Sequence, residues 1–418
     1  MSKEKLIPDL RFPEFKNEGE WTETILGSVV EMKGRIGYRG YTTEDIVDKG
    51  KGAITLSPSN FKENGQLNFD KCTYISWAKY NESPEIQLEE GQTVLVKTAS
   101  VGKTAYVDKL PEKATVNPQI VVLKPKTIHN RFLSFTVSHQ NSQTQIRNNV
   151  GAGAIPNISQ EIISKIKILI PPDKERKEQQ KIATCLSSLD EVIAAQSQKL
   201  DLLKDHKKSL MQNLFPQEGE KVPKYRFEEF EKDGEWVETK LGDSAIFING
   251  KAYKQEELLE TGKYRVLRVG NFFTNKNWYY SDLELEEDKY CEDGDLLYAW
   301  SASFGPRVWR GEKVIYHYHI WKVLPAESIS NDFLFVLLDK ETEQMKTQNA
   351  NGFALLHITK GTIESWECSI PESKLEQQKI ASCLSSLDTL ITAQAEKIEQ
   401  LKLHKKGLMQ GLFPKIND

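Results

Sequence analysis

The 418-residue sequence predicts an α+β protein with two mixed, strand-rich domains in tandem repeat, separated by two long antiparallel coiled-coil helices. Three observations lead to this prediction: the chain repeats in order, the most similar parts of the copies have a heptad pattern, and the interiors contain short apolar runs. The expected segments are 1–172 for the first domain, 173–216 for the first helix, 217–371 for the second domain and 372–414 for the second helix.

The internal repeat is clearest at the two ends of each copy. Residues 11–27 return as 226–242 at an offset of 215, and residues 178–216 return as 376–414 at an offset of 198, with 27 of 39 positions identical. Because the offset falls along the chain, the order is kept and the second copy is shorter inside. The interiors share only scattered residues. Two sites of different specificity on one framework would produce this pattern, and so would an old duplication with relaxed loops.

Each of the two most similar segments predicts a coiled-coil helix, because apolar residues alternate at spacings of three and four over several heptads. The seam residues are Leu186, Leu189, Ile193, Leu200, Leu203 and Leu210 in the first helix, and Leu384, Leu387, Ile391, Ile398, Leu401 and Leu408 in the second. Pro216 and Pro414 should end the helices, and Ser373 with Glu376 has the spacing of a capping box.

We expect the two helices to pair with each other within one chain. About 155 residues lie between them and must return the chain, so the pair should be antiparallel. Packing of each helix on its own domain, or pairing between two chains, is the alternative. The interiors predict strands near 93–97, 119–123, 165–170, 296–300 and 318–324, and shorter helices near 130–142 and 331–349.

Composition excludes several classes of protein. No apolar stretch is long enough to span a membrane, and the start of the chain lacks the apolar core of a signal peptide, so we expect a soluble, cytoplasmic protein. The five cysteines form no CxxC pair and predict neither a disulfide framework nor a zinc site. Net charge is −4, but residues 91–170 contain ten Lys or Arg against three Asp or Glu, so a polyanion could find a basic surface.

No catalytic apparatus is predicted in this chain. The sequence Gly102-Lys103-Thr104 resembles the end of a phosphate-binding loop, but Lys97 stands where the first glycine is required. No motif for amino methylation occurs. His317 and His319 alternate in a strand-like run and could bind a metal, but no acidic or cysteine partner has suitable spacing, and a solvent- or DNA-facing pair fits better.

Two glycine turns at matching points of the copies predict DNA contacts. Each follows a strand and places small hydroxyl residues beside cations, which suits close approach to phosphates or base edges. A tight β-turn with ordinary surface lysines is the alternative. The candidate DNA-binding residues are Lys97, Thr98, Ser100, Gly102, Lys103, Trp300, Ser301, Ser303, Gly305, Arg307 and Arg310.

Over its whole length the sequence resembles the specificity subunit of a type I restriction-modification system. The resemblance is carried by Glu-Gln-Gln-Lys-Ile-Ala at 178–183 and 376–381, by the Gly-Glu-Trp openings at 19–27 and 234–242, and by the glycine turns after Val94-Leu95-Val96 and Leu296-Leu297-Tyr298. It implies that each half carries a target recognition domain for one part of a bipartite DNA site. It also implies that the paired helices separate these domains and bind two methyltransferase subunits.

The resemblance further implies which chemistry belongs to partners. S-adenosylmethionine is expected on the methyltransferase subunits, which methylate adenine N6, and ATP and Mg on separate restriction subunits that move along DNA and cleave it. This chain would then hold no cofactor. Two other functions stay open at this point: a non-DNA coiled-coil scaffold carrying two protein-binding domains, and a DNA-modifying enzyme in its own right. Salt-dependent binding to duplex DNA and a methyl-transfer assay would discriminate among them.

Overall fold

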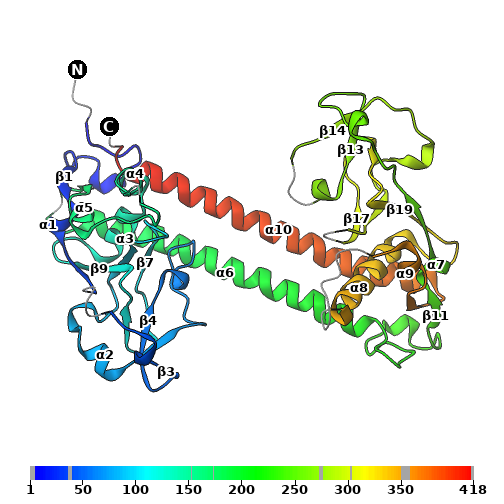
Figure 1. Cartoon of the computed structure of the whole chain (residues 1–418), viewed down its shortest axis with the longest axis horizontal. Helices are drawn as coiled ribbons and strands as arrows, with labels where there is room; N and C mark the ends of the chain where they lie inside the picture. The colour runs from blue at the N-terminus through cyan, green and yellow to red at the C-terminus, as the bar shows by residue number, and fades with distance from the viewer. Residues whose placement is uncertain are drawn as a thin grey trace. The chain divides into compact units, whose positions relative to one another are not determined.

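The computed structural model describes residues 5–35, 40–151, 153–172, 174–272, 276–301, 304–349 and 358–415. It divides into two compact units, each of which contains parts of both copies of the repeat. The first unit is Met1–Gln196 with Lys397–Asp418, and the second is Ser197–Glu396. Each unit therefore joins one strand-rich domain to the start of the long helix that follows it and to the end of the other long helix (Figure 1).

The first unit contains two four-stranded sheets and one strand pair. The sheet orders are β2-β9-β6-β7, β3-β5-β4-β8 and β1-β10; all neighbours are antiparallel except β4 and β8. The strands are β1 (Thr22–Ile25), β2 (Val30–Gly34), β3 (Ile46–Val47), β4 (Gly52–Leu56), β5 (Thr73–Ser76), β6 (Thr93–Val96), β7 (Thr104–Tyr106), β8 (Ala114–Val116), β9 (Ile120–Pro125) and β10 (Lys167–Ile170).

Strand β6 is apolar from Val94 to Val96 because both faces of its sheet are covered. Leu95 lies in the core formed with the helices, whereas Val94 and Val96 lie in a second core shared with the β3-β5-β4-β8 sheet. The alternation of side chains along a strand thus places neighbouring residues in different cores. Residues 94–96 therefore form a strand without the alternation of apolar and polar residues that a strand with one exposed face would have.

In its described residues the first domain has five short α-helices: α1 (Leu26–Val29), α2 (Trp77–Asn81), α3 (Asn130–Ser138), α4 (Gln140–Asn148) and α5 (Gln160–Ser164). Phe132 of α3 is fully buried and its ring lies 5.8 Å from Trp21 and 5.3 Å from Phe413, which follows the last turn of the second long helix. The core of the first domain is therefore completed by the far end of the chain.

The second unit repeats two of these sheets, as β12-β19-β16-β17 and β11-β20. Its third sheet, β14-β13-β18-β15, repeats the β5-β4-β8 part of β3-β5-β4-β8 but has its fourth strand at the opposite edge, beside β18. Its strands are β11 (Val237–Lys240), β12 (Ala245–Asn249), β13 (Tyr264–Leu267), β14 (Tyr279–Ser281), β15 (Tyr290–Cys291), β16 (Leu296–Ala299), β17 (Gly305–Val308), β18 (Val314–Tyr316), β19 (Ile320–Pro325) and β20 (Glu367–Ile370); its short helices are α7 (Leu241–Ser244), α8 (Asn331–Asn349) and α9 (Lys360–Glu364). Here Phe215, at the end of the first long helix, stacks on Phe333 in the place that Phe413 takes in the first unit. The predicted α+β tandem repeat is confirmed.

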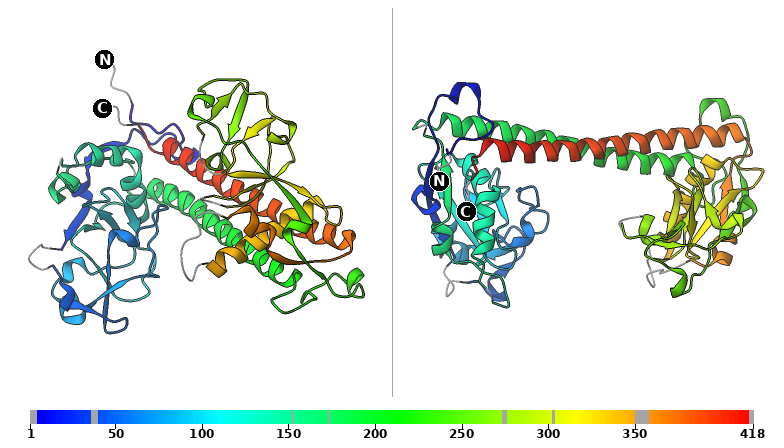
Figure 2. Two further views of the ribbon diagram at one scale, coloured as in Figure 1. Left: turned by 45° about the vertical axis from the view of Figure 1, so that its right-hand side comes forward. Right: turned by 90° about the horizontal axis from the view of Figure 1, so that it is seen from above.

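The long helices are α6 (Lys177–Leu214, 38 residues) and α10 (Lys374–Leu412, 39 residues), and each ends two residues before its proline. In the first unit Lys405 of α10 forms an ion pair with Asp190 of α6, and in the second Lys207 of α6 pairs with Asp388 of α10 at 2.7 Å. Within each unit the helices thus run antiparallel, as the views of Figure 2 also show at both ends of the pair. The twelve predicted seam residues are buried or half-buried.

An Arg–Glu pair attaches each long helix to its domain. Arg226 donates to both carboxylate oxygens of Glu376 at 2.8 Å, and Arg11 does the same to Glu178. The capping-box interpretation of Ser373 and Glu376 holds for one half: the Ser373 hydroxyl accepts a hydrogen bond from the Glu376 N–H at 3.3 Å, but the carboxylate is bound by Arg226. Within the described part of the chain, no helix is long and apolar enough to cross a bilayer.

Candidate nucleic-acid interface

In the first unit, residues 97–103 form a tight turn between β6 and β7. The turn needs left-handed backbone at two positions, Ala99 (φ 65°) and Gly102 (φ 94°), and the Gly102 N–H closes it on the Val96 carbonyl at 2.9 Å. Because it joins two antiparallel strands and opens no helix, it cannot act as the phosphate-binding loop of a nucleotide site. An added Cβ at Gly102 would lie 2.7 Å from Gln143 of α4, so the turn packs closely on that helix.

Two neighbouring segments hold this turn through main-chain atoms. The Lys97 N–H donates to the Gln119 carbonyl at 2.8 Å, and the Lys97 carbonyl accepts from the Ile158 N–H at 2.9 Å. The Thr98 hydroxyl donates to Asn157 at 3.2 Å. Three segments far apart in sequence therefore meet at the end of β6.

The second unit builds the same junction with other side chains. The Trp300 N–H donates to the His319 carbonyl at 3.1 Å, and the Trp300 carbonyl accepts from the Ile358 N–H at 2.9 Å. The Trp300 indole N–H also donates to the Tyr318 carbonyl at 2.7 Å. The backbone is repeated while Lys97 is replaced by an aromatic residue, which is the behaviour expected of a site whose ligand differs between the copies.

A groove of about 630 Å³ lies beside the turn in the first unit. Gly102, Lys103 and Thr104 line one side, and the last turns of α10 line another. The groove is strongly basic, with only Glu63 and Asp190 as acids; its cations are Lys62, Lys103, Arg131, Arg147, Lys402, Lys405 and Lys406.

Three of these cations are partly neutralised by carboxylates of the chain itself. Asp190 pairs with Lys405 and lies 3.6 Å from Arg131, and Lys402 pairs with Glu399 at 2.7 Å. No ion pair between Lys62, Lys103 or Lys406 and another described residue occurs. The groove can therefore accept an extended anion such as the phosphate backbone of a nucleic acid.

The predicted contact residues are distributed unevenly around these junctions. Lys103 is exposed in the groove, whereas Lys97, Thr98 and Ser100 are half-buried in the turn. In the second unit Trp300 and Ser301 are half-buried, Gly305 is buried and Arg307 is exposed on β17; Ser303 lies outside the described residues.

Arg310 is separated from the glycine turn of the second unit. Ala299 pairs with Gly305 at the turn end of the β16–β17 hairpin, and Leu296 pairs with Val308 at the other end. Arg310 follows that far end and forms an ion pair with Asp293 at 3.2 Å. The structure therefore does not bring it together with the other predicted contacts.

Sequence reasoning missed the lysines that α10 contributes to the groove. Lys402, Lys405 and Lys406 come from a helix that follows the glycine turn by about 300 residues, and nothing local signals their proximity. It also missed that residues 117–119 and 317–319 form a tight turn at each junction, because alternating residues in 318–324 had suggested a strand through this point.

The surroundings of the two histidines at the second junction favour the neutral form of both rings. Burial, His319 and Arg268 lower the pKa of His317 to about 4, and burial also lowers the pKa of His319. Among the residues that the structure describes, no group of three or more His, Cys, Asp or Glu side chains is arranged to hold a metal ion. Neutral imidazoles at a surface turn suit hydrogen bonding to an uncharged ligand edge.

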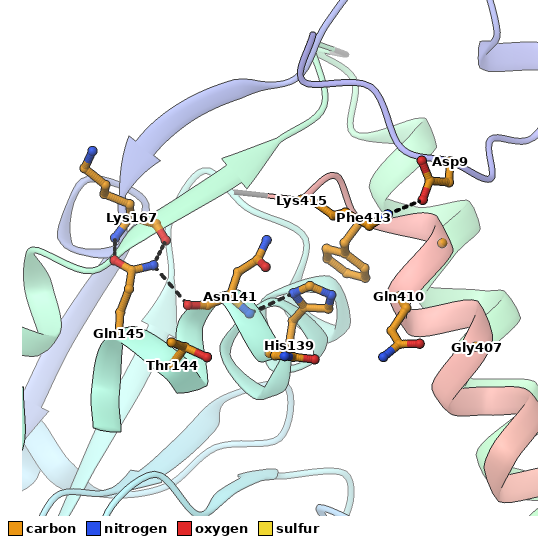
Figure 3. Close-up of a pocket in the computed structure, with 12 residues that line it drawn as sticks. Asp9, His139, Asn141, Thr144, Gln145, Lys167, Gly407, Gln410, Phe413 and Lys415 are labelled. Atoms are coloured by element: carbon orange, nitrogen blue, oxygen red, sulfur yellow. Dashed lines mark hydrogen bonds and ion pairs between the residues drawn. The ribbon is translucent and has the colours of Figure 1, made fainter. Parts of the chain in front are cut away.

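A second hollow in the first unit, of about 830 Å³, lies where α10 ends (Figure 3). His139 stacks on Phe413 with ring centroids 4.8 Å apart, and the Asn141 side chain donates to the Pro414 carbonyl at 2.9 Å. Asp9 pairs with Lys415 at 3.0 Å on its rim. These contacts dock the end of the chain on its first domain, so the hollow is a structural joint.

Comparison with known proteins identifies the family. The family model for the type I restriction modification DNA specificity domain matches residues 21–205 and again 233–403. The chain is 26% identical over 355 residues to the type I restriction enzyme MjaVIII specificity subunit of Methanocaldococcus jannaschii, covering 79% of this chain and 80% of that protein.

Two solved structures share the fold. The S subunit of a type I restriction-modification system from M. genitalium has a TM-score of 0.59 at 16% identity, covering 98% of this chain and 100% of that one. A chain from a structure of the type I R-M system, solved to explain complex assembly and conformational transition, has a TM-score of 0.58 at 16% identity, covering 94% and 97%. The chain belongs to the type I restriction-modification DNA specificity family, and it is a specificity subunit with two tandem DNA-specificity domains.

Proposed function

We propose that each specificity domain reads one part of a bipartite target in double-stranded DNA, and that the long helices bind two methyltransferase subunits. The observation that carries this proposal is the repeated framework. The same main-chain hydrogen bonds hold Lys97 in the first unit and Trp300 in the second, whereas these two side chains differ. The repeated surface of the long helices suits two copies of one partner subunit. The turns, whose side chains differ between the two domains, suit two different DNA sequences.

The docking surface includes a pair of exposed apolar residues at equivalent places on the helices. Val192 of α6 is 44% exposed and Leu390 of α10 is 54% exposed. They are related by the helix offset of 198 residues, and neither occupies a seam position. Apolar side chains left in solvent at the same point of both copies suit burial by two identical partner subunits.

In this proposal the chain supplies recognition and its partners supply chemistry. S-adenosylmethionine binds to the methyltransferase subunits, and ATP with Mg²⁺ to the restriction subunits. The specificity subunit holds no cofactor and no catalytic residue. It works in the cytoplasm, on double-stranded DNA, and its basic groove in the first unit contacts phosphates.

The test is to express the full chain with its methyltransferase subunit, measure the mass of the purified complex, and sequence the methylated sites of the host DNA. We expect one specificity chain with two methyltransferase subunits, and a two-part motif with a fixed gap. The double variant Val192→Asp and Leu390→Asp should lose the partner while Glu191→Lys, at the neighbouring exposed position, should retain it. A single uninterrupted motif, or partner binding unchanged by the double variant, would contradict the proposal.

A further inference from the structure

The turns at 117–119 and 317–319 have the same internal hydrogen bonds in both units. The Gln119 N–H donates to the Asn117 side chain at 3.0 Å, and the His319 N–H donates to His317 Nδ1 at 3.4 Å. In both turns the first side chain is used to close the turn. The side chains of the second and third residues are half-buried or exposed at the surface, where they can meet a ligand.

Each turn also forms a hydrogen bond to the last residue of a strand, β4 in the first unit and β13 in the second. The Asn117 N–H donates to the Leu56 carbonyl at 2.9 Å, and the His317 N–H donates to the Leu267 carbonyl at 2.9 Å. Ser57 follows Leu56 and Arg268 follows Leu267, and the main chain at these two residues makes equivalent hydrogen bonds. The Ser57 N–H donates to Asn60 at 2.9 Å, and the Arg268 N–H donates to Asn271 at 3.1 Å. The duplicated backbone therefore places Ser57 beside one turn and Arg268 beside the other.

Arg268 is a cation without a carboxylate partner among the described residues. Its guanidinium lies 4.2 Å from the ring centroid of Tyr279, and its Nε is buried with no acceptor in the described part of the chain. The charge is close enough to lower the pKa of His317. A guanidinium presents its N–H groups in a planar fork, which matches two acceptors in one plane, and contact with the Tyr279 ring restricts its movement.

The free residues of this turn form a rigid aromatic edge. Tyr318 is 38% exposed, and its ring centroid lies 3.9 Å from that of His319, which in turn lies 4.8 Å from Trp300. In the first unit the same positions hold Pro118 and Gln119, and the Asn117 amide donates to the Gln119 side chain at 3.0 Å. The second unit thus has arginine and aromatic side chains at positions where the first unit has hydroxyl and amide side chains.

We propose that Arg268 and the turn 317–319 are specificity-determining residues of the second domain and that Arg268 binds guanine. Guanine offers O6 and N7 as two acceptors in the major groove, and the arginine fork is their most common specific partner. His319 and Tyr318 contact the neighbouring base. Ser57 and Gln119 are the equivalent residues for the other half of the target. This inference rests on the proposed function, because its readout is the two-part methylation motif.

The test compares Arg268→Lys, Arg268→Ala and His319→Gln in the complete complex with methyltransferase subunits. Arg265→Lys is the matched control: Arg265 lies three residues earlier, near the ring of Trp278, but pairs with Glu312 at 2.9 Å. The motif is read by sequencing methylated DNA, and binding is measured on duplexes in which each base pair of one half-site is replaced.

We expect Arg268→Lys to lose at least about fivefold of the preference for one G·C pair in one half-site, because lysine keeps the charge and loses the fork. The other half-site and the Arg265→Lys variant should be unchanged, and His319→Gln should alter an adjacent position. If Arg268→Lys retains every base preference while Arg268→Ala weakens binding to all duplexes equally, Arg268 is a phosphate contact and the proposal is wrong. If all three variants keep the original motif, it is also wrong.

Loss of folding cannot conceal the result. Thermal unfolding of each variant identifies a destabilised protein, and Arg268→Lys, which retains a cation over Tyr279, decides the outcome if Arg268→Ala unfolds. Absence of any two-part motif with the unaltered chain would overturn the proposed function, and this inference with it. A two-part motif that the variants do not change overturns this inference alone.

Discussion

Arg226 binds the carboxylate of Glu376 through two parallel hydrogen bonds of 2.8 Å, although these residues are 150 positions apart. The side chains are 7% and 1% exposed. Glu376 also accepts a hydrogen bond from the indole of Trp236 at 3.3 Å, and its carboxylate raises the pKa of Arg226. A buried, bidentate pair of this kind fixes the start of a long helix to the first residues of its own domain.

Replacing Glu376 with Gln should therefore destabilise the second unit strongly. The substitution leaves Arg226 buried without a counter-charge, which costs about 3–5 kcal/mol in the free energy of unfolding. Urea denaturation, monitored by tryptophan fluorescence, measures this change in the free energy of unfolding. Glu229→Gln, which removes the exposed pair with Lys379 at 2.9 Å, is the control and should leave the midpoint nearly unchanged. Equal effects of the two variants would show that the pair has no structural role.

Acid should weaken the attachment of α10 to the first domain. Burial lowers the pKa of His139 to about 4 in the folded chain, against about 6.5 when unfolded. The unfolded state thus takes up a proton first, so stability is full above pH 6.5 and falls as the pH drops towards 4. Between pH 7 and pH 5 the loss should be about 2 kcal/mol. Urea denaturation at both pH values measures it.

His139→Asn is the matched variant for this pH dependence. Asparagine can still accept the hydrogen bond that the Asn141 N–H gives to His139 at 3.2 Å, but it does not titrate. Its loss of stability between pH 7 and pH 5 should be smaller than that of the unaltered chain by the amount given. In the second unit Lys340 takes the place of His139 and lies 5.6 Å from the Phe215 ring, so no such dependence is expected there. An unchanged slope in His139→Asn would contradict the assignment.

The chain should tolerate circular permutation. The Leu10 N–H donates to the Gly411 carbonyl at 2.8 Å, and the Tyr225 N–H donates to the Asn213 carbonyl at 2.9 Å. In the second unit nine residues (216–224) connect Phe215 to Tyr225; in the first, residues 414–418 and 1–9 would provide fourteen. A peptide bond from Asp418 to Met1 therefore has enough chain to span the same junction.

A permuted chain opened between Glu218 and Gly219 should fold and give the original methylation motif, as tested by thermal unfolding and sequencing of methylated DNA. Both residues are exposed and lie outside any helix or strand. The control is a permuted chain opened between Leu200 and Asp201 inside α6, which interrupts helical hydrogen bonds and should be destabilised. If both permuted chains fold equally well, the continuity of α6 contributes nothing measurable.

Lys103→Ala and Lys406→Ala should each weaken DNA binding without changing the motif. Both cations line the groove of the first unit, and a phosphate contact contributes about one unit to the salt dependence of binding. Binding of the complex to a target duplex is measured across a salt series. Lys51→Ala is the control, because Lys51 pairs with Asp48 at 3.0 Å and does not line the groove. A change in the methylated motif would instead make Lys103 or Lys406 a base contact.

The sequence predicted the fold well where its information is periodic or repeated. The heptad pattern predicted both long helices, and the family assignment made from the repeated motifs is confirmed, which sets aside the non-DNA scaffold. The sequence could not show which long helix contributes its C-terminal end to the hydrophobic core of which domain. The segments that end in Phe215 and Phe413 are nearly identical, so their chemistry suits either domain equally. Only the folded chain shows Phe413 against Trp21 and Phe215 against Trp236.

The candidate site was less predictable because it is assembled from distant segments. The glycine turn was recognisable from its strand, its glycine and its cation, all of which are local. Lys406 approaches Lys103 only through the pairing of α6 with α10 in the first unit, and Arg268 approaches His317 only through the hydrogen bond to Leu267. Neither relationship has a signature in sequence spacing.

The main-chain hydrogen bonds at Lys97 and Trp300 also bear on how such a protein changes over generations. Because amide and carbonyl groups hold the junction, a new side chain at Lys97 or Trp300 leaves these hydrogen bonds in place. In the proposed function it would change the contact with DNA. In the proposed function the helices bind the same kind of methyltransferase subunit in both halves. Substitutions that change the target are thereby confined to the side chains that contact DNA bases. A descendant of this protein can then acquire a new target sequence in one half without passing through an unstable protein.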